Sequence, residues 1–239
     1  MTPQVLSVFY RLALRSVAES RPKVSGGDKL AYFANAVAMF GASNITVIAD
    51  SMSDLEISPY LEYGCSVIRV SNGTGGGTFR DAAMMAMSLG DDQPVYLLED
   101  DFIHKRSSSG VLLDGIAAGF DYVTCYDHPD KYIDKTNGGN PLVTKGGEST
   151  RLLLTNLSHW KITNSTVMTF ATTPRVLRRD WRLILRHCGG RYTDDYRLFR
   201  DLARRRRYVY SSIPGLCTHS EIQHLSPLVN WSSELTENR

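Results

Sequence analysis

The sequence has few cysteines, and none of them is spaced for a metal site or a disulfide framework. Its four cysteines, Cys65, Cys125, Cys188 and Cys217, lie far apart in a chain of 239 residues. Zinc sites and small disulfide-rich folds need closely paired cysteines. Since 42% of the residues are hydrophobic and 22% are charged, we expect an ordinary globular core that contains four reduced thiols.

Long hydrophobic runs and a strong net charge are also missing. No stretch approaches the roughly 20 apolar residues of a membrane span, and arginines interrupt the apolar residues near the N-terminus, so no signal peptide is indicated. The formal net charge is +2, which gives no general affinity for nucleic acid, and the four arginines at 204–207 are interpreted as a solvated helix end. We therefore expect a soluble, cytoplasmic protein with no transmembrane segment and no nucleic-acid partner, whose oligomeric state stays open.

Strands and helices are expected to alternate in the first half of the chain. Apolar runs predict strands at 5–12, 44–49, 65–70 and 94–98. Asp28 as N-cap and Gly41 as stop predict a helix between them, and helical spacing predicts another at 78–89. This alternation predicts an α/β fold with a mostly parallel central sheet flanked by helices, in a single domain over 1–239. Ligands of such sheets bind beyond the carboxyl ends of the strands.

The second half of the chain is less regular. A strand is expected at 121–126, a mobile loop at 134–150, and a hairpin from 151–155 and 158–162. Pro174 then begins a helix that ends at Gly189, with Trp181 and Leu185 among the residues facing inward. A further helix is expected from Thr193, and a short strand at 208–212.

Three consecutive carboxylates follow the fourth predicted strand. Glu99, Asp100 and Asp101 end the run PVYLLEDD. Adjacent carboxylates repel one another and burial increases that cost, so such a group usually has a cation or hydrogen-bond donors beside it. Oxygen ligands at this density suit Mg²⁺ or Mn²⁺ together with substrate phosphates. The structural alternative is that the two aspartates cap the following loop while Glu99 is solvated.

A glycine-rich segment precedes the second predicted helix. Residues 72–78 read NGTGGGT, and backbone N–H groups of such a loop can meet phosphate. The segment lacks the Lys-Ser/Thr pair of a P-loop, and Thr78 occupies the position of the third glycine in the dinucleotide fingerprint. A flexible turn explains it equally well.

Two further candidates lie in the second half. Asp194 and Asp195 open a predicted helix, where negative charge is stabilised by the helix dipole; the functional alternative is a general base. His219 is either a metal ligand or a hydrogen-bonded structural histidine.

Taken in order, these segments resemble GT-A glycosyltransferases of the family 2 type. ADSMSD at 49–54 resembles the aspartate segment after their second strand, and NGTGGGTFRDAAMMA resembles their N-x-G-x-x-x-A-R-N stretch. LLEDD occupies the position of the DXD motif, and TDDY that of a Glu-Asp pair at a helix start. The chain departs from the family in having Asp81 in place of Asn, a triplet in place of a plain DXD, and no Gln-x-x-Arg-Trp motif, which favours a single-transfer enzyme.

The resemblance implies a single GT-A (Rossmann-like) domain, with a nucleotide-sugar-binding half at 1–104 and an acceptor-binding half at 105–239. It implies a metal-dependent, inverting hexosyltransferase of glycan biosynthesis that uses Mn²⁺ or Mg²⁺, with a UDP-sugar as the favoured donor and a glycan as acceptor. Asp195, or Asp194 beside it, would be the base, and Asp101 with His219 would hold the metal. The donor would be bound by Tyr10, Arg11, Asp50, Arg80, Glu99, Asp100 and Asp101.

Two rival functions use the same features. A sugar nucleotidyltransferase would share the sheet and the metal carboxylates, but it should carry a glycine-rich, Arg/Lys-containing signature near its first strand, and VFYRLALRS lacks that composition. A non-catalytic nucleotide-sugar-binding module would bind the same ligand without turnover. A nucleic-acid binder would be expected to interleave exposed aromatic residues with a broad basic face.

Overall fold

A nine-stranded sheet forms the centre of the protein, in the order β3-β2-β1-β4-β11-β6-β12-β10-β9. The structure is a computed structural model that describes residues 5–14 and 21–237. The strands of the first half are β1 (Ser7–Leu12), β2 (Ile45–Asp50), β3 (Ser66–Val70) and β4 (Val95–Glu99). Those of the second half are β6 (Tyr122–Thr124), β9 (Leu152–Leu154), β10 (His159–Thr163), β11 (Phe170–Thr172) and β12 (Val209–Ile213). All of them except β10 and β11 point the same way, which confirms a mostly parallel sheet.

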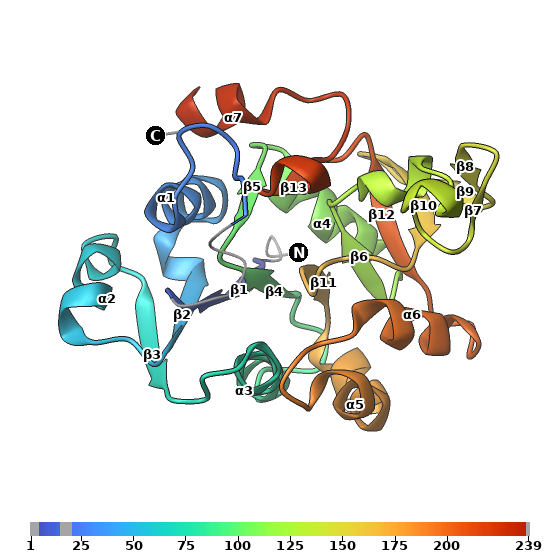
Figure 1. The fold of residues 1–239 in the computed structure, drawn as a ribbon. Coiled ribbons are helices and arrows are strands. Elements are labelled where there is room, and N and C mark those ends of the chain that lie inside the picture. The colour runs from blue at the N-terminus through green and yellow to red at the C-terminus, as the bar shows by residue number, and fades with distance from the viewer. Residues whose placement is uncertain (1–4, 15–20, 238–239) are drawn as a thin grey trace.

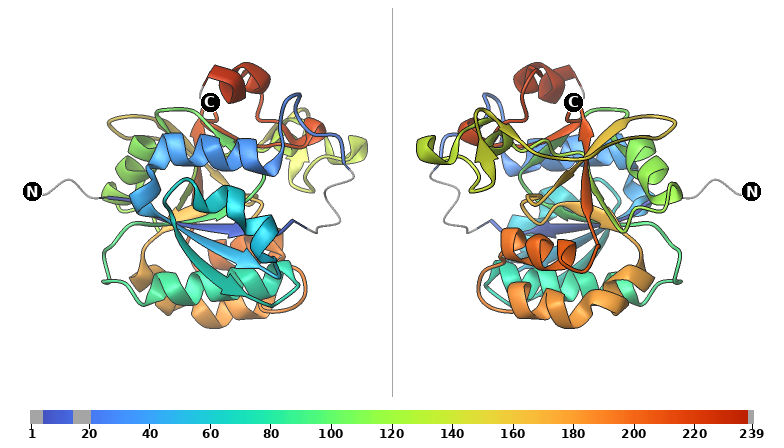
Figure 2. Two further views of the ribbon diagram at one scale, coloured as in Figure 1. Left: turned by 90° about the vertical axis from the view of Figure 1, so that its left-hand side faces the viewer. Right: turned by 90° about the vertical axis from the view of Figure 1, so that its right-hand side faces the viewer.

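Helices cover both faces of the sheet (Figures 1 and 2). The faces are lined by α1 (Lys29–Phe40), α2 (Asp54–Leu61) and α4 (Ser108–Ala117) on one side, and by α3 (Gly75–Met87), α5 (Pro174–Cys188) and α6 (Asp195–Ala203) on the other. A last helix, α7 (Trp231–Glu237), lies beyond α1. No helix in the described ranges is long and apolar enough to cross a bilayer.

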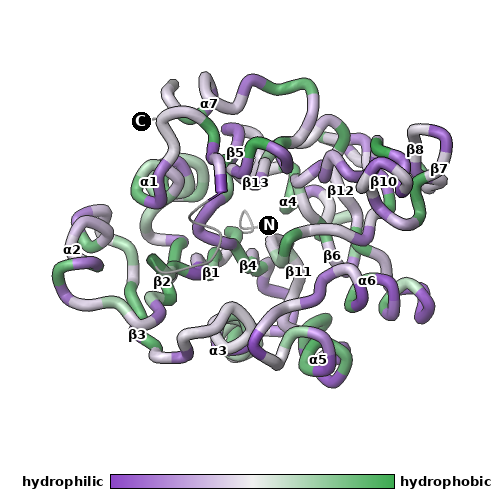
Figure 3. Tube along the Cα trace, in the orientation of Figure 1, coloured by the Kyte–Doolittle hydropathy of each residue, from purple (hydrophilic) through white to green (hydrophobic). Residues whose placement is uncertain are grey.

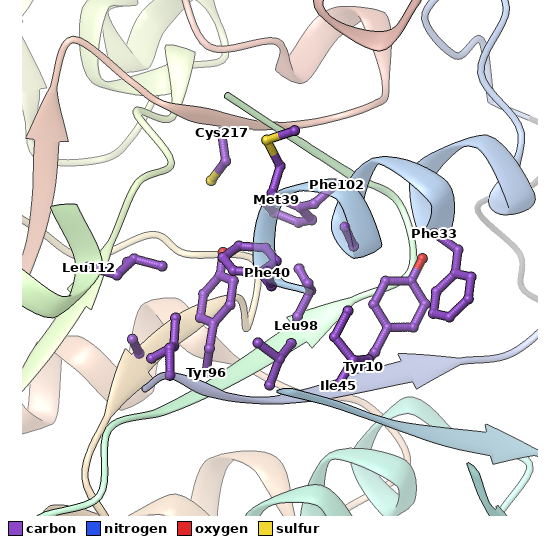
Figure 4. Packing of buried hydrophobic residues seen from close by; sticks show 14 of the residues in the cluster. Tyr10, Phe33, Met39, Phe40, Ile45, Tyr96, Leu98, Phe102, Leu112 and Cys217 are labelled. Atoms are coloured by element: carbon purple, nitrogen blue, oxygen red, sulfur yellow. The ribbon is translucent and has the colours of Figure 1, made fainter. Parts of the chain in front are cut away.

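Alternating side chains of the central strands build the two halves of the core. In β1, Val8, Tyr10 and Leu12 face α1 and α2, whereas Phe9 faces α3. β4 alternates in the same way, because successive side chains of a strand point to opposite faces. Figure 4 shows Tyr10 beside Phe33 of α1, and their rings meet edge-on at 5.0 Å. The four cysteines are free and buried, as expected.

Two small sheets and several single turns complete the structure. One sheet pairs β5 (Phe102–His104) with β13 (Cys217–His219), and the other pairs β7 (Val143–Thr144) with β8 (Gly147–Glu148). The short 3-10 helices are η2 (Ala42–Asn44), η3 (Pro129–Tyr132), η4 (Lys135–Asn137) and η5 (Ile222–His224). β5 follows the acid triplet directly, so the triplet lies where the chain leaves the large sheet for the β5-β13 ribbon.

Most predicted elements are present, with some corrections. The Asp28 carboxylate caps α1 by accepting a hydrogen bond from the Ala31 N–H, and Gly41 ends the helix at φ 81°. The predicted hairpin at 151–162 is β9-β10. However, α3 begins at Gly75 and not at Thr78, because the Thr74 hydroxyl caps it and the glycines form its first turn. Leu185, predicted to face inward, is 38% exposed on α5.

Several elements were not predicted, among them α2, α4, α7, the β5-β13 pair and the β7-β8 hairpin. The sequence signal for α2 is the capping box Ser53-x-x-Glu56, in which each side chain accepts from the other residue's backbone N–H. The α4 helix begins within a run of three serines, 107–109, and its N-cap Ser107 makes no side-chain cap hydrogen bond. The predicted loop at 134–150 contains the β7-β8 hairpin, whose strands are only two residues long.

A buried histidine makes the stability of this fold depend on pH. The Nε2 of buried His104 forms a hydrogen bond with the Tyr96 hydroxyl at 2.9 Å. Burial lowers the pKa of His104 to about 3. In the unfolded chain this histidine has the ordinary pKa of about 6.5. Between pH 6.5 and about 3 the unfolded chain therefore binds a proton that the folded chain does not. The free energy of unfolding falls over this range as pH falls, by up to about 1.4 kcal/mol per pH unit. We expect His104→Phe to flatten this dependence in urea unfolding at pH 7.5 to 5.

The exposed His159 of β10 offers the matched control. His159→Phe replaces an exposed histidine, and the stability of this variant is expected to depend on pH as that of the parent chain does. An equal slope in the His104 variant and the parent would show that His104 binds a proton as readily in the folded chain as in the unfolded chain.

Candidate functional site

The acid triplet lies at the carboxyl end of β4, in the middle of the large sheet. Glu99 is the last residue of the strand, and Asp100 and Asp101 form the turn into β5. The neighbouring strand β1 ends beside it, with Arg11 in register with Glu99. The three acids therefore stand at the sheet edge where parallel α/β folds bind ligands.

Each acid of the triplet meets a different basic side chain. The Arg11 guanidinium lies 2.7 Å from Glu99, the Lys29 ammonium 2.6 Å from Asp100, and the Lys23 ammonium 3.0 Å from Asp101. These bases come from β1, from the segment after it, and from the first residue of α1. The positive charges expected beside three adjacent carboxylates thus come from the stretch that runs from β1 to the start of α1.

The three carboxyl groups titrate differently. Burial raises the pKa of Glu99 to about 7, although Arg11 opposes the shift. Burial also raises the pKa of Asp100, against the ammonium of Lys29. At Asp101 burial acts in the same direction, but His219 and Lys23 outweigh it and lower the pKa. Asp101 is therefore the member of the triplet that stays fully ionised near neutral pH.

His219 of β13 lies next to Asp101, as the predicted metal pair requires. Its Nε2 is 3.0 Å from a carboxylate oxygen of Asp101. The backbone N–H of Glu221 donates to Nδ1 at 3.3 Å, so the neutral ring carries its proton on Nε2 and donates it to Asp101. Metal ligation through Nε2 would require the hydrogen bond from Glu221 to break.

The fit of this site to a divalent cation depends on the carboxylates. Within the described part of the chain, no three His, Cys, Asp or Glu side chains converge as a metal cage. Mg²⁺ commonly binds one or two carboxylates and completes its shell with water and phosphate oxygens. Asp100 and Asp101 meet that requirement when a phosphate substrate supplies the other ligands, whereas the tautomer of His219 does not.

Tyr10 and Arg11 of β1 are buried and contact the triplet. The Tyr10 hydroxyl donates to the backbone carbonyl of Asp100 at 3.3 Å, and the ring lies within the core. The Arg11 side chain is only 2% exposed, donates to the carbonyl of Met168 at 3.0 Å, and stacks over Phe79. Both residues were predicted to bind the donor, and in the structure both are buried below the acids.

Asp50 organises the glycine-rich segment. Its carboxylate accepts hydrogen bonds from the Ser51 hydroxyl, the backbone N–H groups of Asn72 and Gly73, and the Thr78 hydroxyl. These bonds lower the pKa of Asp50 although burial opposes them. The predicted base-binding residue thus already has four partners within the chain.

We expect Asp50→Ala to lower the free energy of unfolding by about 2 to 4 kcal/mol, because it leaves buried donors without an acceptor. Asp54→Ala is the control. Among the described residues the Asp54 carboxylate forms one ion pair, an exposed one with Arg69, so this substitution should cost less than about 1 kcal/mol. Urea unfolding measures both. Unchanged stability together with weaker nucleotide binding would instead support the base-binding role.

Arg80 lies apart from the acids. It is on α3, its side chain is 42% exposed, and its nearest carboxylate is that of Asp81 at 3.7 Å. Asp81 is itself held by the Asn72 amide at 2.7 Å. The structure therefore does not bring Arg80 into contact with the triplet.

Asp194 and Asp195 have different partners. Asp194 is the N-cap of α6, and its carboxylate accepts from the Arg197 N–H. Asp195 accepts instead from the backbone N–H groups of Thr166 and Val167, both at 2.8 Å. The structural interpretation as a helix cap thus applies to Asp194, whereas Asp195 binds a turn of a neighbouring segment.

That turn, at 166–169, has a strained backbone and forms hydrogen bonds with Arg11 and Glu99. Val167 and Met168 both have positive φ, 47° and 52°, which is an outlier for a β-branched residue. Arg11 binds the Met168 carbonyl, and the Thr169 hydroxyl accepts from the Glu99 N–H at 3.2 Å. Such strain persists only where surrounding contacts impose it, and it is concentrated at functional sites. Asp195 is therefore linked to Glu99 through the turn at 166–169 and Arg11.

Sequence reasoning missed Lys23, Lys29 and this turn. A signal for Lys29 existed, because a lysine in the first turn of a helix is unfavourable against the helix dipole unless an acid compensates it. The turn had no such signal, since its φ angles depend on partners far away in the sequence. A shallow depression lined by Ser7 and residues 89–94 lies at the opposite edge of the sheet and contains none of these groups.

No protein-family model matches the sequence, and no curated protein matches it. Among solved structures, CMP:2-keto-3-deoxy-manno-octonic acid synthetase complexed with CTP superposes with a TM-score of 0.50 at 12% identity, over 89% of this chain and 92% of that one. A nucleotidyl transferase from Methanothermobacter superposes with a TM-score of 0.51 at 13% identity, over 98% and 96% of the two chains. At this identity the likeness establishes a shared Rossmann-like α/β fold and does not extend to the family 2 assignment.

Proposed function

We propose that the chain is a transferase that acts at the phosphates of a bound nucleotide, at the carboxyl ends of β1 and β4. The observation that carries the proposal is the pairing of two carboxylates with two lysines at this edge. Asp100 and Asp101 face Lys29 and Lys23 at 2.6 and 3.0 Å, and each of these four side chains is between 10% and 19% exposed.

Such a mixture of charges suits a metal-phosphate complex. Carboxylates alone would repel the phosphates, whereas they bind a cation that the phosphates share. The lysines would then turn to phosphate oxygens, where an ammonium forms charge-assisted hydrogen bonds. When bound, Mg²⁺ would neutralise charge that develops on the leaving phosphate oxygen. Asp100 and Asp101 would hold it, and Mn²⁺ is the alternative cation.

Nucleotidyl transfer is the favoured reaction. Two solved structures of similar fold are those of a synthetase complexed with CTP and of a nucleotidyl transferase. In addition, the described segment after β1, RPKVSGGDK at 21–29, has the glycines and basic residues that such an enzyme should carry near its first strand. An oxygen of the acceptor would attack the α-phosphorus of a nucleoside triphosphate, and pyrophosphate would leave beside Lys23 and Lys29.

Glycosyl transfer is the second candidate. Asp101 and His219 lie 3.0 Å apart, and ligation of a metal by His219 would require its hydrogen bond from the Glu221 N–H to break. Asp101 and His219 are the two residues that the glycosyltransferase resemblance assigns to the metal. In that reaction an acceptor hydroxyl, deprotonated by Asp195, would attack the anomeric carbon of a UDP-sugar, and UDP would leave. The acceptor would be a glycan.

One set of assays separates the candidates. The purified chain is incubated with Mg²⁺ and either a nucleoside triphosphate plus a panel of sugars and sugar phosphates, or a panel of sugar nucleotides plus oligosaccharides. Pyrophosphate release in the first mixture supports nucleotidyl transfer. Nucleoside diphosphate release in the second, with none in the first, replaces it by glycosyl transfer. Nucleotide-dependent thermal stabilisation without either product would identify a binding module and overturn both reactions.

A further inference from the structure

The basic residues of this protein are concentrated in one segment. Residues 174–207 contain twelve arginines, no lysine and four aspartates, a net charge of +8. The remaining residues contain 15 basic and 21 acidic side chains, a net charge of −6. The overall charge of +2 therefore conceals a strong separation of charge, which the sequence interpretation of a solvated helix end underestimates.

The fold places this segment in one outer layer. It consists of α5, α6 and the turns that follow each of them, and α5 lies between α3 and α6 (Figures 1 and 2). Figure 3 shows hydrophilic and hydrophobic residues alternating around α5, and the hydrophobic side, with Leu177 and Ile184, is buried on the sheet. The five arginines of α5 are all exposed and lie on its outer side.

Some of these arginines are neutralised and others are not. Arg175 and Arg178 pair with Asp92 and Asp91 at the start of α5, and Arg207 pairs with buried Asp180. Within the described residues of this segment, five exposed arginine side chains form no ion pair and no hydrogen bond: Arg182, Arg186, Arg191, Arg205 and Arg206. The guanidinium of Arg191 lies over the ring of Tyr192, which leaves four without such a contact. Arg182 and Arg186 are one turn apart on α5 and continue the row of Arg175 and Arg178.

Exposed apolar side chains accompany the unpaired arginines. Leu185 on α5 is 38% exposed, Met84 on the adjoining α3 is 54% exposed, and Tyr192 after α5 is 72% exposed. Arginine forms bidentate contacts with phosphate, and apolar side chains among basic ones can enter the headgroup region of a bilayer. A nucleic acid could contact the arginines and stack on the tyrosine, but it would leave the aliphatic side chains of Leu185 and Met84 without an apolar partner.

From these observations we propose that the outer layer of α5 and α6 docks on the surface of an anionic phospholipid bilayer, through Arg182, Arg186, Arg205 and Arg206. The four side chains would contact lipid phosphates, and Leu185 would dip between the headgroups. This attachment is independent of the reaction at the acid triplet, because none of the four arginines belongs to that site.

Vesicle co-sedimentation tests this docking. The chain is mixed with vesicles of phosphatidylcholine alone, or of phosphatidylcholine and phosphatidylglycerol in a three-to-one ratio. Each arginine near an anionic surface contributes roughly a fivefold change in partition. Replacing the four arginines by glutamine is therefore expected to weaken binding to the anionic vesicles by about 100-fold or more. High salt should also weaken the binding of the parent chain to anionic vesicles, because it screens these charges.

The control removes the same charge from another face. Arg106, Lys135, Lys145 and Arg151 lie outside residues 174–207, are exposed, and form no ion pair within the described residues, so their replacement by glutamine should leave binding nearly unchanged. All eight positions are exposed, and thermal unfolding verifies that both variants are folded. Equal binding to neutral and anionic vesicles, or equal binding by the two variants, would overturn the proposal. So would binding to duplex DNA at the same salt with none to anionic vesicles.

Discussion

Replacement of Asp101 by asparagine is expected to reduce turnover by about 10³-fold or more. Asparagine keeps the size of the side chain and can still accept a hydrogen bond from His219 or Lys23, which lie 3.0 Å away. It lacks the charge that a divalent cation needs, and Asp101 is the carboxylate of the triplet whose pKa is lowered. Turnover is measured with the substrates found active in the assays above.

Chelation should have the same effect as the substitution. Excess EDTA is expected to abolish product formation, and added Mg²⁺ should restore it in the parent chain but not in Asp101→Asn. Asp134→Asn is the matched control, because that aspartate lies in the segment between η3 and η4 and its contacts are with residues 137–146. Full activity of Asp101→Asn, or of the parent in EDTA, would remove the metal and the triplet from the mechanism.

Replacement of Asp195 by asparagine is expected to lower turnover by about 10²-fold or more. The carboxylate binds two backbone N–H groups of the strained turn at 166–169. An amide is a weaker acceptor because it carries no charge, so the turn loosens beside Arg11 and Glu99. If Asp195 is in addition the general base of a glycosyl transfer, the loss should reach about 10⁴-fold.

The pH-rate profile separates the two roles of Asp195. A positioning role lowers the rate at every pH and leaves the shape of the profile unchanged, whereas loss of a base removes its acidic limb. Asp194→Asn is the internal control, since Asp194 caps the same helix through the Arg197 N–H and loses similar dipole energy. A large loss in Asp194→Asn with little in Asp195→Asn would show that the turn is irrelevant to turnover.

The order of strands and helices, and the edge at which the acids stand, follow from the sequence alone. The strands predicted from apolar runs end at Leu12, Ala49 and Leu98, and β1, β2 and β4 end at Leu12, Asp50 and Glu99, within one residue of the prediction. Local rules also place the ends of α1 and α5, because Asp28, Gly41 and Pro174 act through bonds within a few residues of themselves. Hydrophobic periodicity and capping depend on near neighbours only, so a single sequence contains them.

The partners of the acids were decided by the tertiary structure. Lys23 and Lys29 lie 78 and 71 residues before the aspartates that they meet, and Asp195 binds backbone groups 28 and 29 residues away. The hydrogen bonds that the Asp50 carboxylate accepts, and the burial of Arg11, likewise depend on contacts between distant segments. A charged side chain has the same local sequence signature whether it meets a phosphate, a cation or its own backbone. Which of these it meets depends on the packing of elements far apart in the chain, because Coulomb and hydrogen-bond energies depend on distance in space and not on separation in sequence.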